Sequence, residues 1–128
     1  MLIVEDDKEL VGYLKTEFAP RTKNLHTAGD GVEALESLEK EPVDIIVSDV
    51  MMPGMDGIEM CGKIKSYVET SHIPVILLTT RTAIEYTTEG YRIGADDYLT
   101  KPFDIQLLIT RRHNLTNTRH LLPLHFPQ

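Results

Sequence analysis

The chain has 128 residues, of which 41% are hydrophobic, and a formal net charge of −7. This length suits one domain with a sizeable core, and no apolar run approaches the roughly 20 residues that a membrane-spanning helix needs. We therefore expect no membrane contact. The acidic balance argues against direct binding of nucleic acid. The lone cysteine, Cys61, cannot form an internal disulfide, which favours a cytoplasmic domain.

The first half of the chain predicts two strands, each followed by a helix. Residues 2–4 are apolar, and nearly continuous apolarity is typical of a parallel strand covered on both faces. A helix is expected over 7–19, a weaker strand over 24–28, and a second helix over 30–40 with Asp30 as its N-cap. The apolar stripes of the two helices consist of Leu10, Val11, Leu14 and Phe18, and of Val32, Leu35 and Leu38.

The second half continues the alternation. Apolar strands are expected at 43–47 and 75–78, and a weaker, partly polar strand at 97–99. A Thr-rich segment, 82–93, is a weaker helix candidate. Two further helices present apolar stripes made of Ile58, Cys61, Ile64 and Val68, and of Ile105, Leu108, Ile109 and Leu115.

Five strands that alternate with five helices predict an α/β fold, a doubly wound five-stranded parallel sheet flanked by five helices. The two weak strands suit the edges of the sheet, which need less apolar covering. We expect one domain over 1–119 and a C-terminal tail or linker over 120–128. In such sheets the functional crevice lies beyond the carboxyl ends of the strands.

Acids, hydroxyls and a lysine follow the predicted strands at that rim. A cluster of carboxylates is costly unless positive charge joins it, and Mg²⁺ suits such a site because it takes a few carboxylates and keeps several waters. A cation, a lysine and a hydroxyl donor around a nucleophilic carboxylate predict a site for phosphoryl transfer. The residues at the strand ends are Glu5, Asp6 and Asp7, then Ser48 and Asp49, then Thr79 and Thr80, then Tyr98 to Pro102.

Four motifs occur in an order and spacing that resemble the receiver domain of response regulators, over residues 2–119. The resemblance is strongest to receivers of hybrid two-component sensors. It implies the flavodoxin-like strand order 2-1-3-4-5. The motifs are Glu5-Asp6-Asp7, the segment from Asp49 to Gly57, the segment from Pro74 to Thr79, and the segment from Gly94 to Phe103.

The resemblance implies roles for the acids. Asp49 would be the phosphoacceptor. Asp7 and Asp49 would bind Mg²⁺ directly, with the backbone carbonyl of Met51 as a third ligand, and Asp6 would act through a metal-bound water or as an outer acid. From the residues alone, an acid pair after a strand is more often a helix N-cap with a solvated neighbour, which is the simpler interpretation of Asp7.

The resemblance also implies a switch. Thr79 would bond the phosphoryl oxygen, Lys101 would pair with the phosphoryl group, and Tyr98 would change rotamer in response. Lys101-Pro102 resembles a cis peptide site that would orient the lysine. Taken singly, these residues are a strand-end hydroxyl, a surface lysine and a half-buried aromatic of an edge strand.

A receiver accepts its phosphoryl group from a kinase phosphohistidine and catalyses only its own phosphorylation and dephosphorylation, so we expect no conventional enzyme. The expected partner is a histidine kinase, which in hybrid proteins lies in the same chain. The response surface would be the fourth helix, the fifth strand and the fifth helix, through which an output domain is controlled or two copies pair. Met51, two residues beyond Asp49, cannot place a hydrolytic water, which predicts a long-lived phosphoryl group.

Three alternatives remain open from the residues. An aspartate-nucleophile phosphatase of the haloacid dehalogenase type usually has a second acid two residues beyond the nucleophile, where this chain has Met51. A pseudo-receiver would keep the fold without phosphorylation, although such domains typically lose an acid, Thr79 or Lys101, all of which are present. A flavodoxin is disfavoured because no Ser/Thr-rich phosphate loop follows the first strand.

Overall fold

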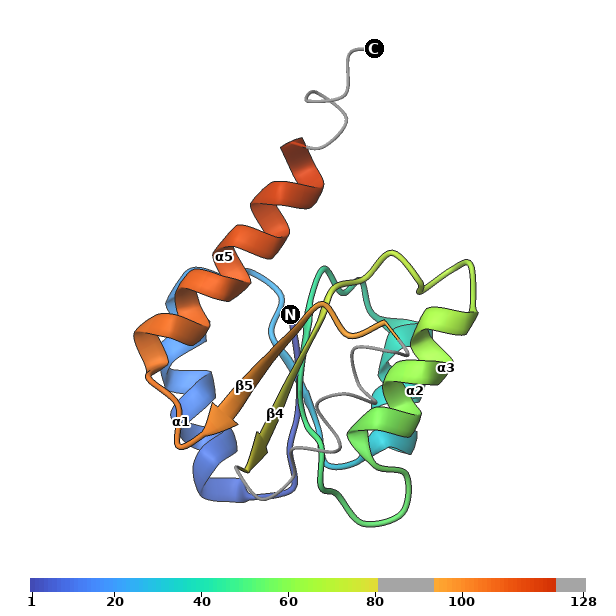
Figure 1. The fold of residues 1–128 in the computed structure, drawn as a ribbon, viewed down its shortest axis with the longest axis horizontal. Helices are drawn as coiled ribbons and strands as arrows, with labels where there is room; N and C mark the ends of the chain where they lie inside the picture. The colour runs from blue at the N-terminus through green and yellow to red at the C-terminus, as the bar shows by residue number, and fades with distance from the viewer. Residues whose placement is uncertain (81–93, 122–128) are drawn as a thin grey trace.

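The computed structural model describes residues 1–80 and 94–121, except for the side chains of residues 118–121. Within them the chain forms a five-stranded parallel sheet in the order β2-β1-β3-β4-β5 (Figure 1). This confirms the predicted sheet and places the two weak strands at its edges. The strands are β1 (Leu2–Val4), β2 (His26–Ala28), β3 (Ile46–Asp49), β4 (Val75–Thr80) and β5 (Asp97–Lys101).

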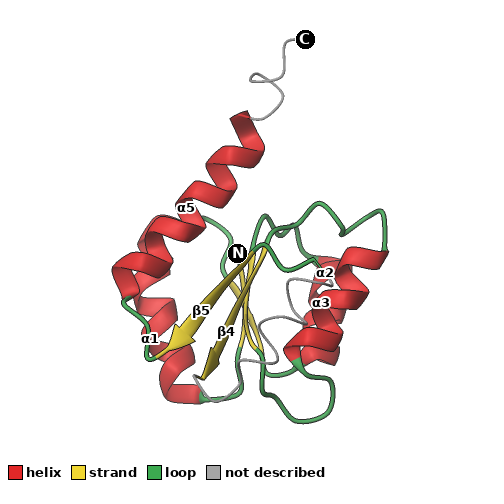
Figure 2. Ribbon diagram, viewed as in Figure 1, coloured by secondary structure: helices red, strands yellow, loops and turns green. Residues whose placement is uncertain are grey.

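Helices cover both faces of this sheet (Figure 2). Helices α1 and α5 lie on one side, and α2 and α3 lie on the other. The helix expected over 82–93 falls outside the described residues, and α5 continues across the domain boundary expected after residue 119. The helices are α1 (Lys8–Phe18), α2 (Gly31–Lys40), α3 (Gly57–Ser66) and α5 (Ile105–Leu121), with a short 3₁₀ turn at Ala19–Arg21 after α1.

The sheet separates two hydrophobic cores. Side chains of a strand alternate between its two faces, so in β1 Leu2 and Val4 pack toward α2 and α3. Ile3 packs toward α1 and α5, together with Leu14 and Phe18. Both faces of each central strand are therefore covered by helices, which accounts for the nearly continuous apolarity of these strands in the sequence.

The predicted helix starts are confirmed, whereas two predicted core residues are not. Asp30 caps α2, its carboxylate accepting from the Glu33 amide at 2.9 Å. Val32 is 54% exposed because it lies in the first turn of α2 and faces outward, and Val68 is 85% exposed. Helix α3 already ends at Ser66, so the expectation that Val68 continues its buried stripe is wrong.

Strand β3 lies later in the chain than the predicted segment 43–47. It begins at Ile46, whose amide donates to the Pro74 carbonyl at 2.9 Å, and runs to Asp49. Pairing with β4 therefore brings Asp49 itself into the strand, opposite Leu78. Among the described helices, none is long and apolar enough to cross a membrane.

Candidate functional site

Three charged residues meet at the edge of the sheet where the strands end. Asp49 is the last residue of β3 and Lys101 the last residue of β5. Glu5 directly follows β1, and its amide extends the ladder by donating to the Ala28 carbonyl at 3.0 Å. Because all strands are parallel, their carboxyl ends lie at the same edge of the sheet, as the sequence predicted.

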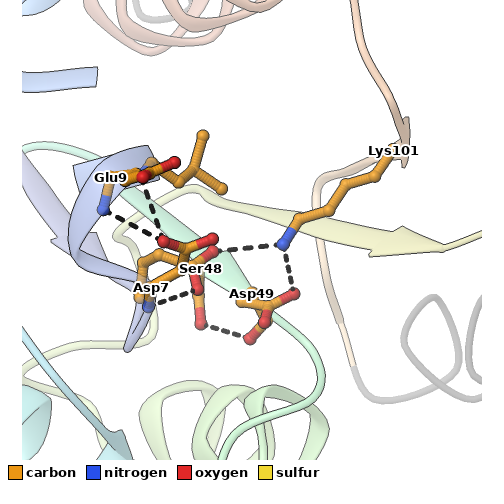
Figure 3. A network of polar contacts seen from close by, with 7 residues as sticks. Asp7, Glu9, Ser48, Asp49 and Lys101 are labelled. Carbon is orange, nitrogen blue, oxygen red and sulfur yellow. Dashed lines mark hydrogen bonds and ion pairs between the residues drawn. The ribbon is translucent and has the colours of Figure 1, made fainter. Parts of the chain in front are cut away.

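Lys101 contacts both acids. Its Nζ lies 3.1 Å from Asp49 Oδ1 and 3.2 Å from Glu5 Oε1. Figure 3 shows the lysine side chain extending toward Asp49. Strand β4 lies between β3 and β5, so the long lysine side chain reaches past one strand to join residues that are far apart in the sequence. Asp49 and Glu5 are 7% and 3% exposed, and because buried carboxylates need a counterion, the ammonium group of Lys101 stabilises both.

Burial dominates the electrostatics of the two acids. It raises the pKa of Asp49 above its ordinary value, against the opposing hydrogen bond and charge of Lys101. Burial likewise raises the pKa of Glu5, a change that the nearby Asp49 charge reinforces and the Asp7 amide and Lys101 oppose. One lysine therefore does not fully compensate two buried carboxylates, and the site favours a further positive charge.

The same lysine remains protonated in this surrounding. Burial lowers the pKa of Lys101, but the hydrogen bond and charge of Asp49, helped by Glu5, outweigh that effect, so its pKa lies above the ordinary value. A permanent ammonium group thus faces the Asp49 carboxylate. It is placed to neutralise negative charge on that carboxylate or on an anion bound to it.

Three carboxylates form a group that fits a hard cation. Glu5, Asp6 and Asp49 each offer an oxygen atom within 4.8 Å of the other two. Asp6 is exposed while the other two are buried, so a bound ion would contact protein on one side and solvent on the other. An all-oxygen donor set that is open to water is the kind of site that Mg²⁺ prefers.

Asp7 does not belong to this group. Its Oδ1 accepts from the Glu9 amide at 3.0 Å and the Leu10 amide at 3.4 Å, so it caps α1 (Figure 3). Its own amide donates to Glu5 Oε2 at 3.1 Å and helps to hold that acid. The simpler interpretation of Asp7 as a helix cap is therefore the one that the geometry supports.

Glu5 is the residue whose role the sequence interpretation missed. The sequence places it in the acidic motif but predicts no metal or lysine contact for it. The available signal was its place directly after the last apolar residue of β1, because the first residue past a strand is the one held nearest the sheet edge. The structure brings it to Lys101 and Asp49, which were both predicted site residues.

The other predicted residues occupy the same edge or its surroundings. Thr79, in β4, is 2% exposed, and its Oγ1 lies 3.5 Å from the Thr80 carbonyl, a long hydrogen bond. Tyr98, in β5, is half-buried against the core beneath α2 and α3. Met51 is 53% exposed, two residues beyond Asp49. The predicted cis peptide bond between Lys101 and Pro102 is confirmed.

The start of α3 packs directly on the backbone of the site. The Gly57 amide donates to the Val50 carbonyl at 2.8 Å, and a Cβ atom at position 57 would lie only 2.3 Å from the Asp49 carbonyl oxygen. Asp56 caps the helix by accepting from the Glu59 amide at 2.8 Å. A glycine is thus required here for close approach rather than for an unusual backbone angle.

A buried carboxylate beside a fixed ammonium group and an oxygen-rich cation site is suited to phosphoryl transfer. That reaction depends mainly on positioning and on neutralising the charge of the transferred group. The carboxylate would act as the nucleophile. No other group of three or more potential metal-ligating acids, histidines or cysteines occurs within the part of the chain that the structure describes.

Comparisons with known proteins agree with this geometry. A family model described as the response regulator receiver domain matches residues 1–113. The chain is 40% identical over 126 residues to histidine kinase P4 of Formosa agariphila, covering 98% of this chain and 9% of that protein. It is 42% identical over 110 residues to the heme response regulator HssR of Staphylococcus epidermidis, covering 86% of this chain and 48% of that protein.

Solved structures share the fold. The signal receiver domain of a signal transduction histidine kinase from Syntrophus aciditrophicus superposes with a TM-score of 0.84 at 34% identity, covering 91% of this chain and 88% of that chain. The chain spans less than half the length of the two curated relatives above, so the similarity concerns one domain of each.

Proposed function

Because this chain belongs to the response regulator receiver domain family and is therefore a phosphorelay domain, we propose that Asp49 accepts the phosphoryl group from the phosphohistidine of a histidine kinase. The observation that carries this proposal is the contact of 3.1 Å between Lys101 and the buried Asp49 carboxylate. As a receiver domain, the chain is not a conventional enzyme.

In the proposed reaction a carboxylate oxygen of Asp49 attacks the phosphorus atom of the phosphohistidine. The new bond is P–O, the broken bond is P–N, and the kinase imidazole leaves and takes a proton from solvent. Lys101 moves its contact from the carboxylate to the phosphoryl oxygens, where its charge offsets part of the roughly −1.5 to −2 that the phosphoryl group carries. Bound Mg²⁺ would supply further neutralisation of those oxygens.

The metal ligands in this proposal differ by one residue from those expected from the sequence. Asp6 and Asp49 would bind Mg²⁺ directly, with the Met51 carbonyl as the expected third ligand, and Glu5 would act through a bound water. The support is the grouping of the three carboxylates. Asp7 is left out because its carboxylate already accepts from two amides of α1.

Thr79 and Tyr98 would transmit the change. The Thr79 hydroxyl makes only a long bond at present, so it can turn toward a phosphoryl oxygen at low cost. Tyr98, which is half-buried in the adjacent strand, would then move inward. The response surface would comprise β5, α5 and the segment 82–93, whose structure lies outside the described residues, and two copies could pair through it.

The relatives support the proposed partners. One relative is named a histidine kinase, and the alignment with this chain covers only 9% of that relative's length. Another relative is named a response regulator. We place this receiver within or beside a histidine kinase in a hybrid two-component protein. Its output would be transcription regulation, through a separate domain, since this chain has a net charge of −7.

Incubation with acetyl phosphate and Mg²⁺, followed by intact mass spectrometry, tests the assignment of Asp49. One phosphoryl adduct is expected for the wild-type chain and none for Asp49→Asn. Asp104→Asn, which changes an exposed acid just before α5, should keep the adduct. An adduct that persists in Asp49→Asn would contradict the proposal.

A further inference from the structure

Helices α2 and α3, which lie side by side on one face of the sheet (Figure 1), enclose a groove of about 800 Å³. It is separate from the carboxylate group and from every residue used in the proposed phosphoryl transfer. Its lining comes from α2, from the loop before α3, and from the end of α3 and the residues after it. The side chains on which the argument depends are Val32, Glu36, Glu39, Lys63, Tyr67 and Glu69.

The groove has an apolar floor and apolar rims. Leu35, Leu38 and Met55 are partly buried at its floor, where they pack against the core. Val32 and Tyr67 are 54% and 61% exposed and stand at its rims. Large apolar side chains that line a groove and remain in contact with water are typical of interaction surfaces. Their burial against a partner would be favourable.

The charges around the groove are mostly negative, three glutamates against Lys63. Glu36, Glu39 and Glu69 line it, and their carboxylates have no ion pair or hydrogen bond within the described residues. The neighbouring acids of the same region behave differently: Glu33 accepts from the Gly29 amide at 3.1 Å, and Glu41 lies 3.7 Å from His26. The three acids that face the groove therefore remain available to pair with cations of a partner.

We propose that this groove binds a basic amphipathic helix of a partner protein or of another domain. Helix α2 has ten residues, a length of about 15 Å at 1.5 Å per residue, so the groove holds roughly three helical turns of an occupant. Aliphatic side chains at i, i+3 or i+4, and i+7 would contact Leu35 and Leu38. Lysine or arginine residues flanking that stripe would pair with Glu36 and Glu39.

Lys63 gives the occupant an orientation. It belongs to α3, opposite the two acids of α2, and lines the groove. A basic helix with cations along one edge and an acid along the other would match both walls, whereas the reversed orientation would place like charges together. The charges therefore select the orientation as well as the partner.

The test uses the full chain, labelled with ¹⁵N, and a synthetic peptide probe. The capped peptide KLLKKLLKKLLK is titrated while amide chemical shifts are recorded, and ELLEELLEELLE serves as the acidic control. We expect shift changes confined to α2, α3 and residues 67–70, and no saturable binding of the acidic peptide. Changes spread over the whole surface, or concentrated on α1 and α5, would overturn the proposal.

Matched variants separate a specific groove from general attraction to an acidic protein. Glu36→Lys combined with Glu39→Lys should weaken binding about tenfold, since it removes two exposed ion pairs with the peptide and places like charges beside its lysines. Glu17→Lys combined with Asp44→Lys changes the net charge equally outside the groove and should weaken it less than about twofold. Equal weakening by both pairs would reduce the interaction to nonspecific charge.

The apolar part of the proposal has its own variant. Tyr67→Ser removes an exposed ring and should leave the fold intact, which an unchanged spectrum away from residue 67 would verify. The peptide should then bind several-fold more weakly. Unchanged affinity in this variant would show that the ring takes no part in docking and would contradict the groove as the binding surface.

Discussion

The Nζ atom of Lys101 lies 3.1 Å from Oδ1 of Asp49, although β4 separates the strands that carry them. Only a side chain as long as lysine reaches across a strand in this way. The contact gives Asp49 a cation without filling the open side of the site, where the exposed Asp6 lies. The proposed nucleophile is therefore neutralised from within the sheet and remains accessible from solvent.

The raised pKa of Asp49 predicts a stability that depends on pH. The carboxyl group of Asp49 binds its proton more tightly in the folded chain than in the unfolded chain. Its contribution to the free energy of unfolding is therefore present below the ordinary pKa of 3.8 and is lost as pH rises through the raised pKa. Without divalent metal, Asp49→Asn should therefore gain stability relative to the wild type as pH rises above 3.8, because the amide carries no charge that burial would penalise. Urea unfolding at each pH measures this difference, and a difference that stays constant with pH would contradict the prediction.

Adjacent acids at the end of β1 should respond differently to alanine substitution. Asp6→Ala should weaken Mg²⁺ binding about tenfold or more and leave the metal-free stability nearly unchanged. Asp7→Ala should retain Mg²⁺ binding but lower the free energy of unfolding by about 1 kcal/mol, because it removes the cap of α1. Calorimetric titration with MgCl₂ and urea unfolding separate the two effects. A larger loss of Mg²⁺ affinity in Asp7→Ala would restore the assignment expected from the sequence.

Met51 should set the lifetime of the phosphoryl group. It is exposed, two residues beyond Asp49, and its side chain has no group that can orient an attacking water. Met51→Asn should therefore speed dephosphorylation, by roughly tenfold if one hydrogen bond to the water contributes about 1.4 kcal/mol in the transition state. The decay of the phosphorylated chain, followed by intact mass after removal of acetyl phosphate, gives the rate. A slower or unchanged rate would refute this role.

Two glycines provide a matched test of packing at the site. Gly57→Ala places a Cβ atom 2.3 Å from the Asp49 carbonyl oxygen, and the required backbone shift should cost about 2 kcal/mol or more. Gly12→Ala lies within α1 with nothing within 4 Å of the added atom, and should stabilise the chain by about 0.5–1 kcal/mol. Urea unfolding of both variants checks the contrast. Similar effects of the two substitutions would contradict the close approach of α3 to the site.

The order of strands and helices was predictable because it depends on local patterns. Short runs of β-branched residues indicated strands, and Asp30 marked a helix start through its capping preference. The exposure of Val32 and Val68 was not predictable in this way. Val32, in the first turn of α2, and Val68, just past the end of α3, both fit the apolar periodicity of the sequence. Whether another element covers such a residue depends on how the neighbouring helices and loops are placed.

By itself the sequence determined that acids, a hydroxyl and a lysine gather at one edge, because parallel strands align their carboxyl ends. Only the tertiary structure decided which of the consecutive acids turn inward. Strand β1 ends at Val4 and α1 begins at Lys8, so Glu5, still at the end of the strand, meets Lys101, while Asp7, at the start of the helix, turns to the amides of α1. Glu5 and Asp49 both contact Lys101 because of the strand register and because the lysine side chain reaches across the sheet. No local sequence pattern encodes either property.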